Sequence, residues 1–161
     1  YFWKMEYIMI CVGKIDNREL NSLIEEYTAR IKHYYKFSII EIPNIKRKKY
    51  LSKKEQKLKE SELIQKQILP TDYVVVLDEK GKHYSSEEFS IFLNKNMVSG
   101  IKRLIFLVGG AYGFSEKILN QHKTLLSLSK MTFSHQMVRL FFVEQLYRGF
   151  SILNNEPYHH K

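Results

Sequence analysis

Cysteine, proline and long apolar runs are all scarce in this sequence. One cysteine, Cys11, occurs among 161 residues, and it lies inside a short apolar run. A single cysteine excludes a disulfide framework, so we expect Cys11 to be a small buried side chain in a protein of a reducing compartment, the cytoplasm. No apolar run approaches the roughly 20 residues that a membrane-spanning helix needs, so we expect no membrane partner.

The N-terminus has neither the basic region nor the longer apolar region of a secretory signal. Tyr1–Lys4 precede Met5 and are expected to be an N-terminal extension. Residues 5–161 have the length of one domain with one good core. No internal repeat, low-complexity tract or linker divides them, so we expect a single domain.

Acidic residues are also few beside basic ones: 17 Asp and Glu face 26 Lys and Arg, for a formal net charge of +9. Surplus positive charge on a small domain favours a polyanionic partner, most often nucleic acid, although lysine also serves solubility alone. The densest cluster of cations is Lys46–Lys59. This segment is either a solvated surface or an arm that follows phosphates without reading bases.

The order of strands and helices predicts an α/β fold. Glu6–Val12 is a short β-rich run, Asp16 and Glu19 after it have the spacing of a helix capping box, and Phe37–Ile42 is a second strand. A strand, a helix and a strand in this order favour a parallel sheet with a right-handed crossover. Three more strands are predicted at Tyr73–Leu77, Arg103–Val108 and Thr124–Leu128.

The helices between these strands are predicted to cover both faces of the sheet, because Tyr73–Leu77 is apolar at every position. A polar helix around Lys53–Lys59 is closed by Pro70. Ser85 and Glu88 have capping-box spacing and open a helix through Asn96. Residues 78–82, which separate this helix from its strand, are predicted to form a turn. A short helix spans Ser115–Gln121.

Three strand ends are predicted to converge at one edge of the sheet, at Leu77-Asp78, Val108–Gly113 and Leu128–Phe133. Ligands of open α/β sheets collect at this edge, and a pocket of apolar side chains and backbone amides suits an adenosine-like ligand. The loop Gly109–Gly113 matches neither the dinucleotide-binding fingerprint nor a P-loop.

The last helix is apolar on nearly every side between Met137 and Tyr147, and we expect its first turn to hold His135 and Arg139 on one face. Such a helix is buried either by its own fold or by a second copy of the chain. We expect a homodimer, because the apolar surface is larger than one small domain readily covers. That surface comprises Phe141, Phe142, Leu146, Tyr147 and Phe150.

The tail, Pro157–Lys161, combines an aromatic ring with nitrogen-bearing side chains. It either frays or stacks on a base and contacts phosphate. No metal site is expected, because His159 and His160 are adjacent and the only cysteine lies in a strand, which leaves no ligand set of usual spacing.

Six blocks of the sequence resemble the RlmH family of SPOUT-class methyltransferases, which act on a pseudouridine in bacterial large-subunit ribosomal RNA. The blocks are ICVGK (10–14), LDEKGKHYSSEEF (77–89), FLVGGAYGF (106–114), LSLSKMTFSHQMVRL (126–140), EQLYRGFSI (144–152) and PYHH (157–160). The resemblance extends from Met5 to Lys161. It implies a C-terminal trefoil knot, an obligate homodimer and S-adenosylmethionine held by the knot loops.

The resemblance also assigns residues to the site. The cofactor contacts that it implies are Leu77, Gly109, Gly110, Leu128, Ser129, Lys130, Met131, Thr132 and Phe133. The family reaction methylates N3 of the pseudouridine, whose imide must lose a proton. We therefore expect Arg139 to stabilise the imide anion and His135 to be the first candidate base. His159 is the second candidate base, and Tyr158 is expected to position or stack the substrate base.

The chain departs from the family pattern at two positions. Ser134 stands before His135, where the family commonly has proline, and is expected to cap the helix instead. Tyr112 stands in the glycine loop, where family members often have a small or acidic residue. Three rival functions remain: a SPOUT methyltransferase of another RNA such as transfer RNA, a non-catalytic ribosome- or RNA-binding protein, and a nucleotide-binding dehydrogenase.

Overall fold

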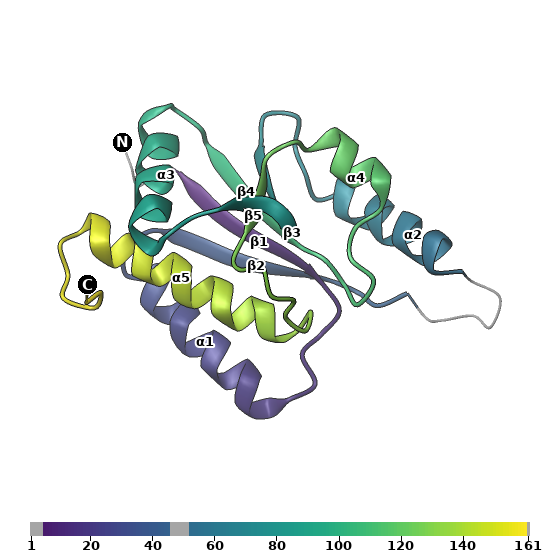
Figure 1. Cartoon of the computed structure of the whole chain (residues 1–161), viewed down its shortest axis with the longest axis horizontal. Coiled ribbons are helices and arrows are strands. Elements are labelled where there is room, and N and C mark those ends of the chain that lie inside the picture. The colour runs from purple at the N-terminus through teal and green to yellow at the C-terminus, as the bar shows by residue number, and fades with distance from the viewer. Residues whose placement is uncertain (1–4, 46–51, 161) are drawn as a thin grey trace.

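The structure, a computed structural model, describes residues 5–45 and 52–160. Of the predicted basic segment Lys46–Lys59, residues 46–51 lie outside the described residues. Ten elements follow one another along the described chain (Figure 1). They are β1 (Glu6–Val12), α1 (Arg18–Lys32), β2 (Lys36–Ile42), α2 (Lys53–Gln65), β3 (Tyr73–His83), α3 (Ser86–Val98), β4 (Arg103–Val108), α4 (Glu116–Gln121), β5 (Leu125–Ser127) and α5 (Met137–Leu153).

The five strands form one sheet in the order β2-β1-β4-β3-β5, and every neighbouring pair is parallel. The sequence prediction of a mainly parallel α/β sheet is therefore confirmed. Parallel strands place all their carboxyl ends at one edge, which is the edge where a ligand site is expected. The trefoil knot implied by the family resemblance stays a prediction.

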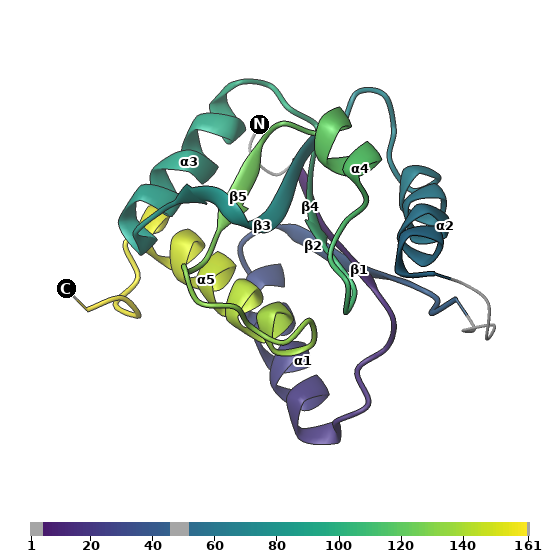
Figure 2. The ribbon, with the colours of Figure 1, turned by 45° about the vertical axis from the view of Figure 1, so that its right-hand side comes forward.

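Helices cover both faces of the sheet, as predicted. Figure 2 shows α1, α3 and α5 on one side of the strands and α2 and α4 on the other. Within β1, Tyr7, Met9 and Cys11 point into the core under the first group. Their neighbours Ile8 and Ile10 point into the second core. Burial on both faces explains why the central strands are apolar at successive positions.

Strand β3 is longer than predicted, because residues 78–82 lie within it instead of forming a free turn. The register of β3 against β5 shifts between Leu77 and Lys82, as in a β-bulge. A Cβ on Gly81 would lie 2.6 Å from the carbonyl carbon of Leu125. Glycine is therefore needed where these two strands approach each other most closely.

The starts of α1 and α3 agree with the sequence prediction to within a residue. The side chain of Asn17, and not that of Asp16, caps α1 by accepting a hydrogen bond from the Leu20 backbone nitrogen at 2.8 Å. The predicted capping box of Ser85 and Glu88 is present at the start of α3. Helix α2 begins after Ser52 and ends at Gln65, well before Pro70, which was predicted to close it.

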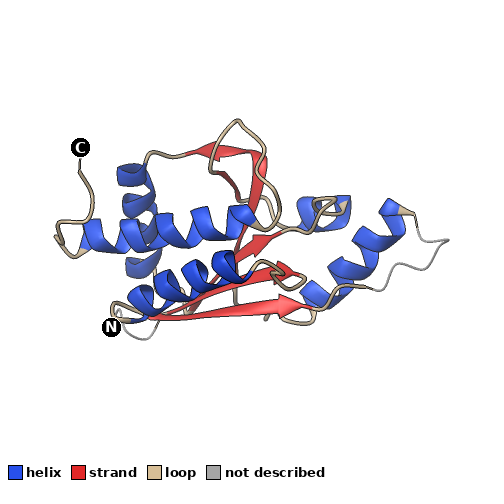
Figure 3. Cartoon of the chain, turned by 90° about the horizontal axis from the view of Figure 1, so that it is seen from below, coloured by secondary structure: helices blue, strands red, loops and turns tan. Residues whose placement is uncertain are grey.

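Helix α5 begins at Met137, so His135 precedes it and the prediction that His135 lies in its first turn is wrong. The hydroxyl of Ser134 accepts a hydrogen bond from the Met137 backbone nitrogen at 3.0 Å, which is the capping role predicted for it. Figures 1 and 3 show that α5 runs beside α1 across one face of the sheet.

The apolar surface of α5 is mostly buried within the chain itself. Phe142, Leu146 and Phe150 are each 0% exposed, so the argument that they require a second copy is wrong. Phe141 and Met137 remain exposed at 40% and 39%. Within the described part of the chain, no helix combines the length and the apolar character needed to cross a membrane.

Candidate functional site

A pocket of about 350 Å³ opens at the carboxyl ends of β3, β4 and β5. The three strand ends that were predicted to converge all contribute to it. Its lining residues are Leu77, Asp78, Glu79, Val108, Gly109, Gly110, Ala111, Tyr112, Gly113, Phe114, Leu126, Ser127, Leu128, Ser129, Met131, Thr132, Phe133, His135 and Val138. Every residue implied as a cofactor contact is among them except Lys130, which is exposed.

The glycine loop forms one wall of the pocket with its backbone. It folds as a tight turn, in which the Gly113 nitrogen donates to the Gly110 carbonyl oxygen at 3.1 Å and Gly113 has a φ of +77°. A Cβ on Gly109 would lie 3.2 Å from the ring of Phe114. Small residues here keep the peptide groups open to a ligand.

The segment between β5 and α5 forms the opposite wall, and its own hydrogen bonds hold its shape. The Ser127 hydroxyl donates to the Ser129 carbonyl oxygen at 2.8 Å, and the Ser129 hydroxyl accepts from the Met131 nitrogen at 3.0 Å. The Thr132 hydroxyl then donates to a Glu79 carboxylate oxygen at 2.7 Å. This last bond joins the segment to β3, and both of its residues line the pocket.

His135 lines the pocket, as its assignment to the site requires. Partial burial and the nearby positive charge of Arg139 lower the pKa of its imidazole, and Asp16 opposes them in part. A lowered pKa keeps the ring neutral near pH 7, so that one ring nitrogen can accept a proton.

Arg139 does not line this pocket. It is 1% exposed, and its guanidinium donates to the carbonyl oxygens of Gly13, at 2.8 Å, and Val12. It borders a separate cavity beside α1 instead. Arg139 and His135 therefore contact different parts of the structure. Arg139 is hydrogen-bonded to the end of β1, whereas His135 lines the pocket.

Tyr158 and His159 lie in a cluster along α5 that we call the tail cluster. Its members are Tyr27, Glu87, Glu144, Tyr147, Arg148, Tyr158 and His159. The Tyr158 hydroxyl donates to a Glu144 carboxylate oxygen at 3.0 Å and lies 3.1 Å from the Tyr27 hydroxyl. Burial and these two bonds raise the pKa of Tyr158. Neither tail residue lines the pocket.

His159 is held in the same cluster by two neighbours. Its Nδ1 lies 3.1 Å from a guanidinium nitrogen of Arg148, and its Nε2 lies 3.6 Å from a Glu87 carboxylate oxygen. Helix α5 is about 25 Å long, at 1.5 Å per residue, and the pocket lies at its first turn. The tail of this chain is therefore placed away from its own pocket.

Sequence reasoning missed Glu79 and Glu60 as residues of the site region. Glu79 directly follows the predicted strand end Leu77-Asp78, so its position after a buried strand was an available signal. Glu60 of α2 is 5% exposed, and its carboxylate oxygens lie 3.5 Å from the position of a Cβ on Gly110. Burial raises the pKa of Glu60. Nothing in the polar sequence of α2 marks this residue as buried.

Comparisons with known proteins agree on one family. The family model described as "Predicted SPOUT methyltransferase" matches residues 5–159. A protein of Christiangramia forsetii named ribosomal RNA large subunit methyltransferase H is 55% identical over 153 residues, which are 95% of this chain and 98% of that protein. A Flavobacterium johnsoniae protein of the same name is 55% identical over 98% of this chain and 100% of its own length.

The fold is also similar to solved structures of distant sequence. The crystal structure of a probable methyltransferase from Bordetella pertussis Tohama I superposes with a TM-score of 0.53 at 8% identity, covering 92% of this chain and 95% of that chain. At this identity the similarity shows the fold alone.

Proposed function

This chain belongs to the SPOUT methyltransferase family, and on that premise we propose that it methylates N3 of a pseudouridine in bacterial large-subunit ribosomal RNA, with S-adenosylmethionine as donor. The ribosomal substrate is taken from the names of relatives that are 55% identical over almost their full length. The pseudouridine and its N3 atom are taken from the family resemblance. Such a reaction would take place in the cytoplasm.

The observation that carries the proposal is the pocket at the ends of β3, β4 and β5. Its size lies at the lower end of the range for small-molecule sites, and it combines apolar walls with open backbone amides. Leu77, Leu128 and Phe133 suit an adenine ring, and the glycine loop suits a ligand that approaches the main chain. S-adenosylmethionine supplies an electrophilic methyl group on a sulfonium when it is bound.

We assign His135 as the general base. An imide nitrogen is a good nucleophile only after it loses its proton, so the enzyme must accept that proton near the donor. His135 is the histidine that lines the pocket, and its lowered pKa keeps it neutral and able to accept. Alignment of the imide with the methyl group supplies a large part of the acceleration.

We revise the assignment of Arg139 from a substrate contact to a positioning residue. Both of its terminal nitrogens are occupied by carbonyl oxygens at the end of β1. Its remaining influence on the site is its positive charge, which lowers the pKa of His135.

Tyr158 and His159 stay proposed substrate contacts, but their contacts in the tail cluster hold them away from the pocket of their own chain. They reach a pocket only if the tail leaves this cluster or if a second copy brings its own pocket to it. We propose a homodimer, which the exposed apolar side chains of Leu23 on α1 and of Met137 and Phe141 on α5 support. Sedimentation that gives a monomer at micromolar concentration would contradict the dimer.

The experiment that tests the function uses labelled S-adenosylmethionine and large ribosomal subunits from a strain that lacks this protein. We expect label on one pseudouridine of the large-subunit RNA, located by mass spectrometry. Label on transfer RNA instead would show that the substrate is wrong and the reaction class right. Absence of both label and S-adenosylmethionine binding would favour a non-catalytic RNA-binding protein.

A further inference from the structure

Helix α2 contacts the glycine loop and the chain that continues from it at three points. The Nζ atom of Lys53 lies 5.1 Å from the centre of the Tyr112 ring. About two helical turns further on, Glu60 packs beside Gly110, and the Ser61 hydroxyl is hydrogen-bonded to the hydroxyl of Ser115. The pocket wall that contains Tyr112 is therefore supported from outside by α2.

The start of this helix is strongly basic. The seven residues Lys53–Lys59 hold four lysines and one glutamate. Lys53 and Lys57 are four residues apart and share one side of the helix, and Lys54 lies next to Lys57 on its surface. Lys53 and Lys54 are exposed. Cations in the first turn are unfavourable to the helix itself, because they face its positive end. Helix stability therefore does not explain them.

Tyr112 connects this basic surface to the pocket. Its ring is half-buried, lines the pocket and lies under the Lys53 ammonium group. An aromatic ring next to a row of lysines is the combination that binds single-stranded nucleic acid, because the ring stacks on a base and the lysines contact phosphates.

We propose that the basic start of α2 and Tyr112 form the surface over which the substrate RNA enters the pocket. Lys53, Lys54 and Lys57 contact the phosphates beside the target nucleotide, and Tyr112 stacks on a base of that strand. This inference rests on the proposed function, since it names where the RNA of that reaction binds. It also gives a role to Tyr112, at a position where related sequences often have a small or acidic residue.

The first test neutralises two lysines of this surface in the full-length protein. We expect Lys54→Gln combined with Lys57→Gln to raise KM for large ribosomal subunits and to reduce the slope of log affinity against log salt by about 1 to 2. Filter binding of labelled subunits measures the slope without any need for methylation. The affinity for S-adenosylmethionine, measured by calorimetry, stays as in the unsubstituted protein.

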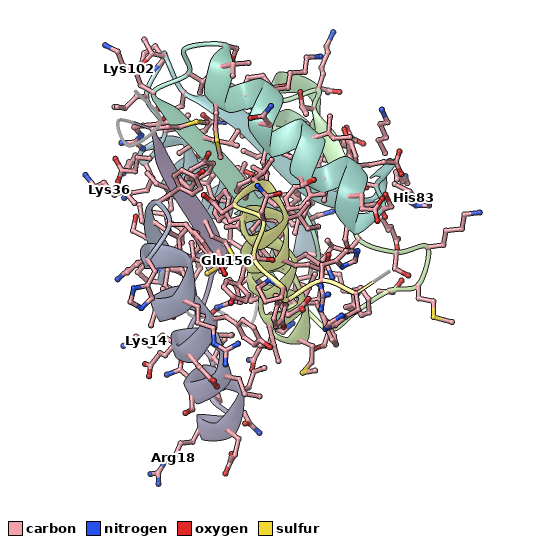
Figure 4. The ribbon with its side chains drawn as sticks, turned by 90° about the vertical axis from the view of Figure 1, so that its left-hand side faces the viewer. Lys14, Arg18, Lys36, His83, Lys102 and Glu156 are labelled. Atoms are coloured by element: carbon pink, nitrogen blue, oxygen red, sulfur yellow. The ribbon has the colours of Figure 1, made fainter. Side chains whose placement is uncertain are left out.

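The matched control removes the same charge at the opposite edge of the sheet. Lys36 and Lys102 lie at the edge where the strands begin, as Figure 4 shows. Lys36→Gln combined with Lys102→Gln should leave the salt slope unchanged. An equal effect of both double variants would mean that only net charge matters, and an unchanged slope in the α2 variant would mean that its lysines are a solvated surface. Either result overturns the proposal.

The second test concerns the stacking. Tyr112→Ala should raise KM for subunits on the order of tenfold, whereas Tyr112→Phe should keep it, because phenylalanine stacks equally well. Weaker S-adenosylmethionine binding with unchanged KM would make Tyr112 a wall of the cofactor pocket and overturn its role in RNA binding. Absence of methylation by the unsubstituted protein would count against the proposed function, while the binding slopes would still decide this inference.

Discussion

Arg139 donates a hydrogen bond to the Gly13 carbonyl oxygen at 2.8 Å, across 126 residues of sequence and from a position that is 1% exposed. A second bond reaches Val12. Together they fix the end of β1 against the start of α5, directly next to the segment that carries His135. The guanidinium thus affects the pocket without lining it. It holds the backbone at the end of β1, and its charge lowers the pKa of His135.

Arg139→Met is expected to lower the free energy of unfolding by about 3 kcal/mol, because two buried carbonyl oxygens lose a charged donor. Urea unfolding measures the loss as a lower midpoint at an unchanged slope. Arg18→Gln is the control, since Arg18 lies at the exposed tip of α1 (Figure 4), and its effect should stay within about 0.5 kcal/mol. If the Arg139→Met protein were as stable as the unsubstituted protein but inactive, the earlier assignment of Arg139 as a substrate contact would be favoured again.

His135→Ala is expected to reduce the rate of methyl transfer by about 10² to 10³, which lies within the range of general base catalysis, with S-adenosylmethionine saturating. The rate of the unsubstituted protein should rise with pH and level off below neutrality. The reason is that the base must be neutral and the pKa of His135 lies below its ordinary value of about 6.5. Single-turnover rates across about pH 5 to 8 measure this profile, and the acidic limb should vanish in the variant.

His122 provides a matched control for that profile. Burial lowers the pKa of His122 as well, but it lies at the end of α4 and does not line the pocket. His122→Ala should leave the acidic limb in place. If the His135→Ala rate stays near that of the unsubstituted protein, the base is another group.

The sequence predicted the sheet well because its central strands are buried on both faces and therefore apolar without interruption. The bounds of β1 and β4 match the predicted ranges. Residues 78–82 misled the prediction, because their composition is that of a turn, and only the pairing of β3 with β5 keeps them in a strand. Asp16 and Asn17 are both capable caps, and the sequence alone does not choose between them.

The site was predicted where neighbours in sequence are also neighbours in space. Residues 128–133, apart from Lys130, line one wall of the pocket, and their place followed from the position of β5. The contacts of Arg139 and Tyr158 were not predicted because their partners are remote in sequence: Gly13 is 126 residues from Arg139, and Tyr27 is 131 residues from Tyr158. No spacing within a single sequence reports such contacts.

Thr132→Val is expected to weaken binding of S-adenosylmethionine about fivefold, because the valine cannot donate the 2.7 Å hydrogen bond to Glu79 that joins two walls of the pocket. Both side chains are exposed, so a larger effect is not expected. Thr132→Ser keeps the hydroxyl and should bind as the unsubstituted protein does. Calorimetry measures the affinities, and equal values for all three proteins would show that the bond does not hold the pocket.

Tyr158→Phe and Tyr27→Phe form a matched pair that separates the two roles of the tail. Each loses the 3.1 Å contact between the two hydroxyls, and Tyr158→Phe also loses the bond to Glu144. Each substitution should therefore cost about 1 kcal/mol of unfolding free energy, with Tyr158→Phe the larger loss.

Activity distinguishes the two residues. If Tyr158 positions the substrate base, Tyr158→Phe lowers kcat/KM for ribosomal subunits more than Tyr27→Phe does, and the affinity for S-adenosylmethionine stays unchanged. Equal activity in the two variants would make Tyr158 a structural residue that ties the tail to α1 and α5, and the substrate contact would then be sought among the residues that line the pocket.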